Sequence, residues 1–159
     1  MKLNNLIVLD CESSGLNNES YPIEVGLALK NKSFSFLINP PKEWSYWNTE
    51  SERIHKIKRK DLFDKGISIF DAVSILNSNL KGLTVYSDAV DFEIFWIDKL
   101  FSKVGIDRSF DIQSIYTLPL DFFKYKELKL RYSKSLILHR AESDALLIRK
   151  SILSSIDNY

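Results

Sequence analysis

The segment LIVLDCESSG (residues 6–15) joins an apolar run to two carboxylates, and the interpretation of the whole chain starts from it. Four apolar residues lead directly into Asp10 and Glu12, and two serines and a glycine follow. Alternate residues of a strand point to the same face of a sheet. The pattern therefore predicts a buried strand over residues 5–12, which ends with Asp10 and Glu12 side by side and Cys11 on the opposite face.

Two carboxylates at one end of a buried strand repel each other and lose hydration. A divalent cation between them removes both penalties, because Mg²⁺ is commonly held by one or two carboxylates together with substrate phosphates. The structural alternative is that Asp10 simply ends the strand and Glu12 is solvated. D-x-E is a common tripeptide, so this segment alone leaves both interpretations open.

The composition predicts a single globular domain spanning residues 1–159. The chain is 45% hydrophobic with a formal net charge of +1, which suits a sizeable core and requires local basic patches for any nucleic-acid partner. The single cysteine excludes an internal disulfide and favours a reducing compartment. No apolar stretch approaches the ~20 residues of a membrane span, and the N-terminus does not resemble a signal peptide. We therefore expect a cytoplasmic protein without a membrane partner, of unknown oligomeric state.

Hydrophobic periodicity and turn residues predict three closely connected strands, followed by alternating helices and strands. The strands are expected at residues 5–12, 23–31, 34–39, 83–88 and 109–114. The helices are expected at residues 68–80, 91–105, 121–132 and 141–156. The segment 41–66 is expected to be irregular, with at most short helical turns. This order predicts an α/β fold whose mixed sheet has three antiparallel strands, then parallel strands, and is flanked by helices.

Three of the predicted helices have a defined apolar stripe or cap. Ser68 is expected to cap the first, and Asp91 the second. The stripe of the first helix is expected at Phe70, Val73, Leu76 and Leu80, and that of the second at Phe92, Phe95, Trp96 and Leu100. The last helix is expected to bury Ala141, Ala145, Ile148 and Ile152.

The segment LHRAESDALL (residues 138–147) supplies a histidine and a further acid. If the last helix starts near Ala141, His139 lies on the preceding loop and Asp144 about one turn inside the helix. His139 can then bend over an ion held by Asp144, and histidine is the usual general base near neutral pH. The alternative is that Asp144 is a surface acid of the helix and His139 a polar loop residue.

Together these two segments resemble the DEDDh 3′-to-5′ exonucleases, which include the proofreading subunit of bacterial replicative DNA polymerase, RNase T and oligoribonuclease. The resemblance extends from Leu6 to Leu147, and its pieces occur in the family's order and spacing. They are VLDCESSGL, IEVGLAL, YSDAVDFEIFWIDKLF and HRAESDA. RIHKI (residues 53–57) is similar to the family's H-G-I segment, with Lys56 in place of the glycine.

The resemblance implies a ribonuclease H-like fold and hydrolysis of single-stranded DNA or RNA, or short oligonucleotides, to nucleoside 5′-monophosphates. It also implies two Mg²⁺ or Mn²⁺ ions, which in such sites lie ~3.5–4 Å apart. Asp10 would bridge both ions, Glu12 and Asp144 would add ligands, and His139 would be the general base. The implied substrate contacts are Ser13, Ser14, Gly15, His55 and Asp88.

The chain departs from the family in the middle motif, which usually ends in N-x-x-F-D. Phe92 and Glu93 align with the F-D pair, so Glu93 is the expected fourth acid although it is one methylene longer. Asp88 aligns with the asparagine and is the alternative ligand. The longer side chain also raises a competing hypothesis, a catalytically impaired protein that binds nucleic acid or a protein partner. The intact outer motifs favour an active enzyme, and no motif distinguishes DNA from RNA.

Two segments and one residue have further alternatives. WSYW (residues 44–47) and HKIKRK (55–60) either stack a terminal base and bind phosphates, or pack and form a solvated charged surface. The same alternatives hold for the basic residues of the predicted helix at 121–132. Cys11 is expected to be a small core residue rather than a redox switch.

Overall fold

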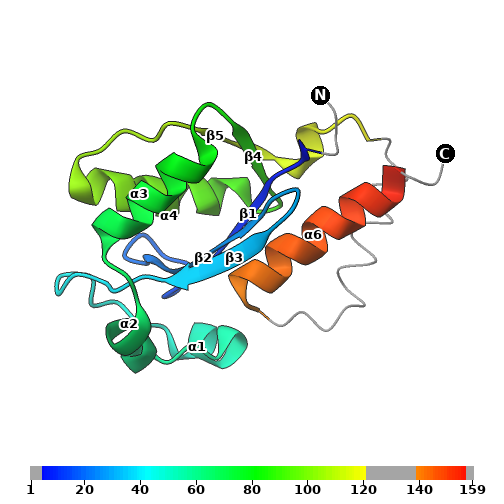
Figure 1. Cartoon of the computed structure of the whole chain (residues 1–159). Coiled ribbons are helices and arrows are strands. Elements are labelled where there is room, and N and C mark those ends of the chain that lie inside the picture. The colour runs from blue at the N-terminus through cyan, green and yellow to red at the C-terminus, as the bar shows by residue number, and fades with distance from the viewer. Residues whose placement is uncertain (1–4, 121–138, 157–159) are drawn as a thin grey trace.

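The computed structural model describes residues 5–120 and 139–156, and its centre is a five-stranded mixed sheet (Figure 1). The strands lie in the order β3-β2-β1-β4-β5. They are β1 (Val8–Ser13), β2 (Pro22–Ala28), β3 (Ser33–Leu37), β4 (Thr84–Ser87) and β5 (Asp111–Ser114). The first three pair antiparallel, whereas β1–β4 and β4–β5 pair parallel. The predicted mixed sheet is therefore confirmed.

Helices cover both faces of this sheet (Figure 1). Helices α3 (Ile69–Leu80) and α4 (Val90–Val104) pack on one face, and α6 (Ala141–Ile156) packs on the other. The predicted irregular segment 41–66 contains two short helices, α1 (Thr49–His55) and α2 (Arg59–Lys65). The 3₁₀ turn η2 (Ile115–Thr117) follows β5. The predicted basic helix at 121–132 lies outside the described residues.

The alternation of β1 assigns its side chains to two separate cores. Ile7, Leu9 and Cys11 belong to the core beneath α3 and α4, whereas Val8 packs in the core beneath α6. Cys11 is thus a buried core residue, as predicted. Because alternate side chains share a face, the carboxylates at the end of β1 lie on the face that α6 covers.

The start of α3 is close to the prediction, but its buried face differs. Ser68 caps the helix by accepting a hydrogen bond from the Asp71 N–H at 3.1 Å. Ile69 is buried where Phe70 was expected, and Phe70 lies exposed. The buried stripe runs through Ile69, Ala72, Val73, Leu76 and Leu80.

Helix α4 begins one residue earlier than predicted, and Asp91 is not its cap. The N-cap residue is Ala89, whose N–H donates to the Ser87 hydroxyl at 3.0 Å. Asp91 therefore lies inside the first turn, where a negative charge still favours the helix dipole. The buried residues of α4 are Glu93, Trp96, Ile97, Leu100 and Phe101.

Helix α6 buries the stripe that the sequence predicts. Ala141, Ala145, Ile148 and Ile152 all lie in the core against β1 and β2. Within the described ranges, no helix combines the length and the apolar character that a membrane crossing requires.

Candidate active site

The acids of β1 lie at the edge of the sheet where two parallel strands end. In the antiparallel ladder with β2, Asp10 is opposite Gly26 and Glu12 is opposite Glu24. β4 runs parallel to β1 and ends at Ser87, so Asp88 follows it at the same edge. Carboxyl ends of neighbouring parallel strands are a recurrent position for functional side chains in α/β sheets.

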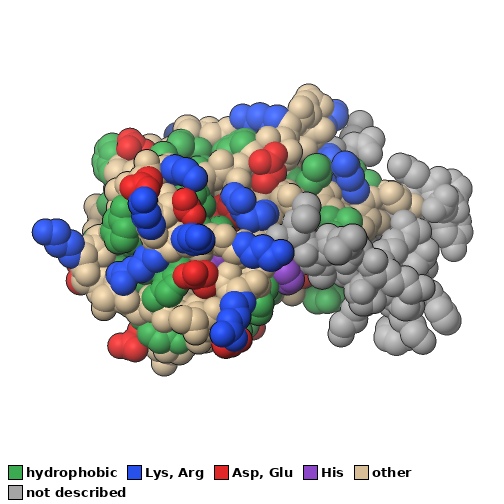
Figure 2. Space-filling model, turned by 90° about the horizontal axis from the view of Figure 1, so that it is seen from below, with side chains coloured by type: hydrophobic (Ala, Val, Ile, Leu, Met, Phe, Trp, Pro, Cys, Tyr) green, Lys and Arg blue, Asp and Glu red, His purple; other side chains and the backbone are tan. Residues whose placement is uncertain are grey.

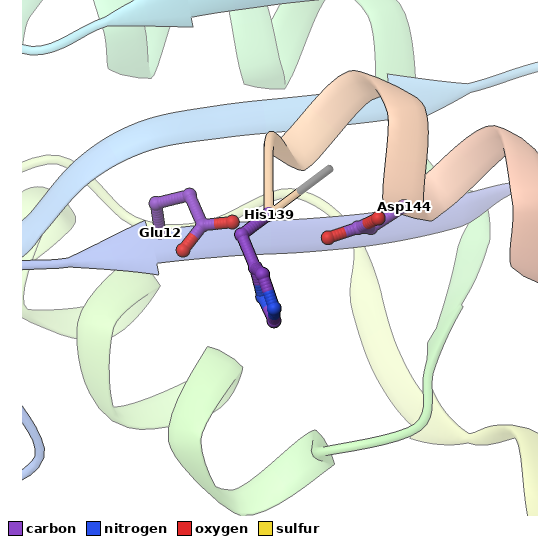
Figure 3. Close-up of side chains that lie close together, drawn as sticks. All are labelled: Glu12, His139 and Asp144. Atoms are coloured by element: carbon purple, nitrogen blue, oxygen red, sulfur yellow. The ribbon is translucent and has the colours of Figure 1, made fainter. Parts of the chain in front are cut away.

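The start of α6 brings a histidine and a third acid over β1. His139 precedes the helix in a left-handed conformation, with φ of 44°, and Asp144 lies in the first turn. One ligand atom from each of Glu12, His139 and Asp144 lies within 4.8 Å of the others. Figure 3 shows the carboxylates of Glu12 on β1 and Asp144 on α6 on either side of His139. Asp10, the remaining acid of β1, is not part of this group of three.

Asp10 and Glu12 lie in a strongly negative environment. Burial, followed by the charges of Glu93, Glu12, Asp88 and Asp144, raises the pKa of Asp10 well above its ordinary value. Burial and the charges of Asp144 and Glu24 raise the pKa of Glu12 to about 8, although Arg140 opposes this. The other four predicted acids thus all contribute to raising the pKa of Asp10.

Glu93 reaches the same cluster from the first turn of α4. Its side chain is only 2% exposed, and its Oε2 accepts a hydrogen bond from the Ser87 hydroxyl at 2.7 Å. Burial and the charge of Asp88 raise the pKa of Glu93 to about 7, with the Ser87 bond acting against them. Asp88 itself is exposed at the end of β4.

The donor set fits a divalent metal. The pKa values of Asp10, Glu12 and Glu93 are all raised by burial together with neighbouring negative charge. A hard divalent cation prefers carboxylate oxygens and supplies the positive charge that such a cluster lacks. These acids therefore have the chemistry to hold divalent cations, and a ring nitrogen of His139 lies within 4.8 Å of a carboxylate oxygen of Glu12 and of Asp144.

The loop that follows Glu12 is held by its own side chains. The Ser13 hydroxyl donates to the Gly15 carbonyl at 2.7 Å, and the Ser14 hydroxyl accepts from the Tyr21 N–H at 3.2 Å. A Cβ on Gly15 would lie 2.5 Å from a ring carbon of Tyr46, so glycine allows this close approach. Both hydroxyls thus stabilise the loop, and the predicted substrate contacts of these three residues stay predictions.

His55, the predicted substrate contact of α1, is buried with one free donor. It is 3% exposed, and its Nδ1 accepts from the Ile57 N–H at 3.0 Å. Nε2 must then carry the proton, and it has no hydrogen-bond partner among the described residues. Burial lowers the pKa of His55, which favours this neutral form.

The aromatic segment WSYW packs against its neighbours. Trp44 is buried and stacks on Tyr21 with ring centroids 5.4 Å apart, and the Trp47 indole donates to Glu52 at 2.6 Å. Arg59 of the following basic segment donates to the Trp44 carbonyl at 3.3 Å. Figure 2 shows Lys and Arg side chains spread over the face that carries α1 and α2, with acidic side chains between them.

A pocket between the loop after β1 and the start of α4 was not predicted. It has a volume of about 170 Å³ and is lined by Leu16, Asn17, Asn18, Ser20, Asp91, Phe92 and Phe95. Leu16 is 70% exposed, and Phe92 and Phe95, which were expected in the core, are 43% and 39% exposed. The signal was present in the sequence: successive helical residues differ by about 100°, so a helix that buries Glu93 turns both phenylalanines away.

Glu24 and Arg140, for which no role was predicted, form an ion pair beside Glu12. A charged residue inside a strand as apolar as PIEVGLA was the available signal, since a buried carboxylate requires partners.

The fold is shared with solved structures of exonuclease I. No family model matches this chain, and no curated protein matches it in sequence. Exonuclease I of E. coli in complex with a dA16 oligonucleotide matches with a TM-score of 0.67 and 13% identity, covering 96% of this chain and 42% of that one. Exonuclease I of Methylocaldum szegediense matches with a TM-score of 0.66 and 11% identity, covering 96% and 42%. An apo exonuclease I matches with a TM-score of 0.71 and 12% identity, covering 92% and 40%.

This chain therefore spans about two fifths of the length of those proteins. At such identities the likeness shows the fold, a ribonuclease H-like α/β arrangement around a mixed sheet, as the sequence predicted.

Proposed function

We propose that this chain is a metal-dependent 3′-to-5′ exonuclease that releases nucleoside 5′-monophosphates from single-stranded DNA or RNA. The observation that carries the proposal is the convergence of Glu12, His139 and Asp144 at the strand end that also bears Asp10. Exonuclease I, which has been solved with bound dA16 and dT13 oligonucleotides, shares the fold and supports a single-stranded nucleic acid as the partner.

In the proposed reaction, Asp10, Glu12, Asp144 and Glu93 would hold two Mg²⁺ or Mn²⁺ ions. Bound divalent ions would supply activation of the attacking water and positive charge near the leaving 3′ oxygen. His139 accepts the proton of that water at an imidazole nitrogen. It is suited to this role because it lies on the turn before α6, beside the carboxylates rather than inside the helix.

The apolar pocket gives the terminal bases a binding surface. Nucleobases stack on aromatic and apolar side chains regardless of sequence. The pocket is lined by residues of the loop after β1 and of the first turns of α4, the two segments that flank Glu12 and Glu93 in the chain. His55, Asp88 and the loop from Ser13 to Gly15 are the remaining proposed contacts; the Nε2–H of His55 has no partner among the described residues but is buried, so it would donate to a nucleotide only after becoming accessible.

The test is digestion of single-stranded DNA and RNA, each labelled at the 5′ end, side by side. With Mg²⁺ or Mn²⁺ the 5′-labelled strands should be shortened stepwise from the 3′ end, which gives a ladder of labelled products. Chelation of the metal should stop this digestion. Asp10→Ala should abolish the ladder, whereas Asp107→Ala, which removes an exposed carboxylate beyond the C-terminal end of α4, should not.

Two outcomes separate the alternatives. Full turnover by Asp10→Ala would disprove the site. Metal-independent binding of the DNA and the RNA without cleavage would favour the competing hypothesis, a catalytically impaired protein that binds nucleic acid. That hypothesis is motivated by the glutamate at position 93.

A further inference from the structure

Glu24 is a charged residue in the middle of a buried strand. β2 is buried along its whole length, and Glu24 is 1% exposed. Its neighbours Ile23 and Val25 face the core beneath α3 and α4, so Glu24 faces α6. A carboxylate buried in this way is stable only with several hydrogen-bond partners.

Four hydrogen bonds satisfy the Glu24 carboxylate, and three come from the turn that begins α6. Arg140 donates from Nη2 to Oε1 at 2.7 Å and from Nε to Oε2 at 2.9 Å. The Ala141 N–H donates to Oε2 at 3.1 Å, and the Ser35 hydroxyl donates to Oε1 at 2.9 Å. The fork of Arg140 fixes both distance and orientation, which a single ammonium would not.

These bonds keep Glu24 ionised. Burial raises the pKa of Glu24, but the bonds from Arg140, Ala141 and Ser35 outweigh burial and hold the pKa below its ordinary value. The charge also favours the N-terminus of α6, whose first N–H it accepts.

The next residue on the same face, Gly26, lets α6 approach the strand directly. A Cβ at Gly26 would lie 2.1 Å from the Ala141 carbonyl carbon and 2.3 Å from the Glu142 nitrogen. The helix start therefore rests on the backbone of β2. Immediately before it, His139 has φ of 44°, a conformation that non-glycine residues adopt only where the surroundings impose it.

We propose that Glu24 is a positioning residue of the active site, which holds Arg140 and Ala141 so that the left-handed turn aims His139 between Glu12 and Asp144. Glu24 does not touch the reacting atoms. It connects the strand beside Glu12 to the turn beside His139, and thereby fixes the relative position of the two halves of the site. In its kinetic consequence this inference rests on the proposed exonuclease function.

The test compares Glu24→Gln with Ser33→Ala. Glutamine keeps the size of the side chain but removes the charge, and its amide offers one acceptor oxygen in place of two. Ser33→Ala is the matched control, because the Ser33 hydroxyl bonds Glu142 in the same turn of α6 at 2.8 Å without contacting Arg140 or Ala141. Glu24→Gln should lower kcat by about 10- to 100-fold with KM within about twofold, and Ser33→Ala should lower neither by more than about twofold.

A second measurement needs no catalysis. The chain has two histidines, so ring NMR signals of the metal-free protein report His139 and His55 separately. In Glu24→Gln the His139 signals should move toward those of an unfolded peptide, while those of His55 stay in place. If Glu24→Gln does not fold, Arg140→Lys is the substitute, because the Arg140 side chain is half-exposed. It should show the same change of the His139 signals in weaker form.

The outcomes keep the two hypotheses apart. Wild-type kcat and unchanged His139 signals in Glu24→Gln, or in Arg140→Lys where the first variant is unfolded, would overturn the positioning role. If the wild-type chain does not cleave nucleic acid, the proposed function fails, and the histidine signals alone decide the positioning role.

Discussion

Glu93 shows at the scale of a single residue how the surroundings define a site. Its carboxyl is buried, bonded to the Ser87 hydroxyl at 2.7 Å, and has a pKa raised to about 7 by burial. To bind a cation the carboxyl must lose its proton, and its Oε2 already accepts a hydrogen bond from Ser87. Asp88 follows the neighbouring strand, and burial raises the pKa of its carboxyl as well, although hydrogen bonds from the backbone of Asp88 and Ala89 oppose this. Substitutions of Glu93 and of Asp88 therefore distinguish which of the two acids is the fourth metal ligand.

If Glu93 is that ligand, its extra methylene displaces an ion or changes a rotamer. Mg²⁺ requires near-ideal octahedral geometry, so we expect Mn²⁺ to support faster turnover than Mg²⁺. Glu93→Gln should lower kcat by about 100-fold or more, and Glu93→Asp should keep substantial activity. Steady-state rates on a labelled oligonucleotide measure both.

Asp88→Asn is the comparison for that series and should be the milder change. An inactive Asp88→Asn beside a healthy Glu93→Gln would assign the fourth ligand to the end of β4 instead of α4.

Removal of the His139 imidazole should affect the rate and not the affinity. As the general base it should contribute about 10²- to 10⁴-fold to the rate, so His139→Ala should lose this factor in kcat. Oligonucleotide affinity, measured by fluorescence anisotropy with Ca²⁺ in place of Mg²⁺, should change by less than about threefold, since the acids remain. A loss of affinity in proportion to the loss of rate would make the histidine a binding residue.

The helices and strands that could be predicted from the sequence are those whose hydrophobic pattern fits only one type of secondary structure. The stripe from Ala141 to Ile152 predicts the bounds of α6, and the apolar run before Asp10 predicts β1, which begins at Val8 instead of residue 5. Glu12 lies on β1, Asp144 on α6 and His139 on the turn before α6, which explains why the grouping of these three side chains could be predicted. For α1 and α2 the sequence predicted only short helical turns without defined bounds, since seven-residue helices depend on tertiary packing more than on periodicity.

The wrong predictions of burial concern apolar side chains that could lie either on the buried or on the exposed face of a helix. Phe92 and Phe95 are as apolar as Trp96, and hydrophobicity alone placed all three in the core. In the structure the inward position of α4's first turn belongs to Glu93, and the phenylalanines line a pocket. The Glu24–Arg140 pair was equally hidden, because its partners lie 116 residues apart and only the fold brings them together.

The contact between β2 and α6 makes a prediction at the scale of elements. In Gly26→Ala the new Cβ would overlap the backbone of Ala141, which no side-chain rotation relieves. The start of α6 must move, so both Tm and kcat should fall strongly. Gly82→Ala is the control: its φ of 71° also disfavours alanine, but no atom lies within 4 Å of the new Cβ.

Gly82→Ala should therefore cost only about 1–2 kcal/mol for the left-handed backbone and leave kcat unchanged. If Gly26→Ala matched it in Tm and in kcat, the close approach of α6 to β2 would not matter for the site.

The whole molecule concentrates buried negative charge at one end of its sheet while its net charge is only +1. Stability, metal binding and pH are thereby linked. Burial and neighbouring acids raise the pKa values of Glu12 and Glu93 to about 8 and about 7, from ordinary values of 4.5. Between these values the folded chain binds more protons than the unfolded chain, so each group's contribution to the free energy of unfolding decreases as the pH rises.

We therefore expect the metal-free protein to lose stability from about pH 4.5 to about pH 8, with Tm at pH 8 at least about 3 °C below that at pH 5. A divalent cation binds the ionised acids, so Mn²⁺ should raise Tm at pH 8 much more than at pH 5. Glu12→Gln removes one titrating group and should flatten the pH dependence, whereas Asp107→Gln, which replaces an exposed acid outside the cluster, should not. Thermal unfolding followed by circular dichroism at both pH values, with EDTA or Mn²⁺, measures all of this. Equal slopes for wild type and Glu12→Gln, together with equal Mn²⁺ effects at both pH values, would mean that the cluster neither titrates in this range nor binds the cation.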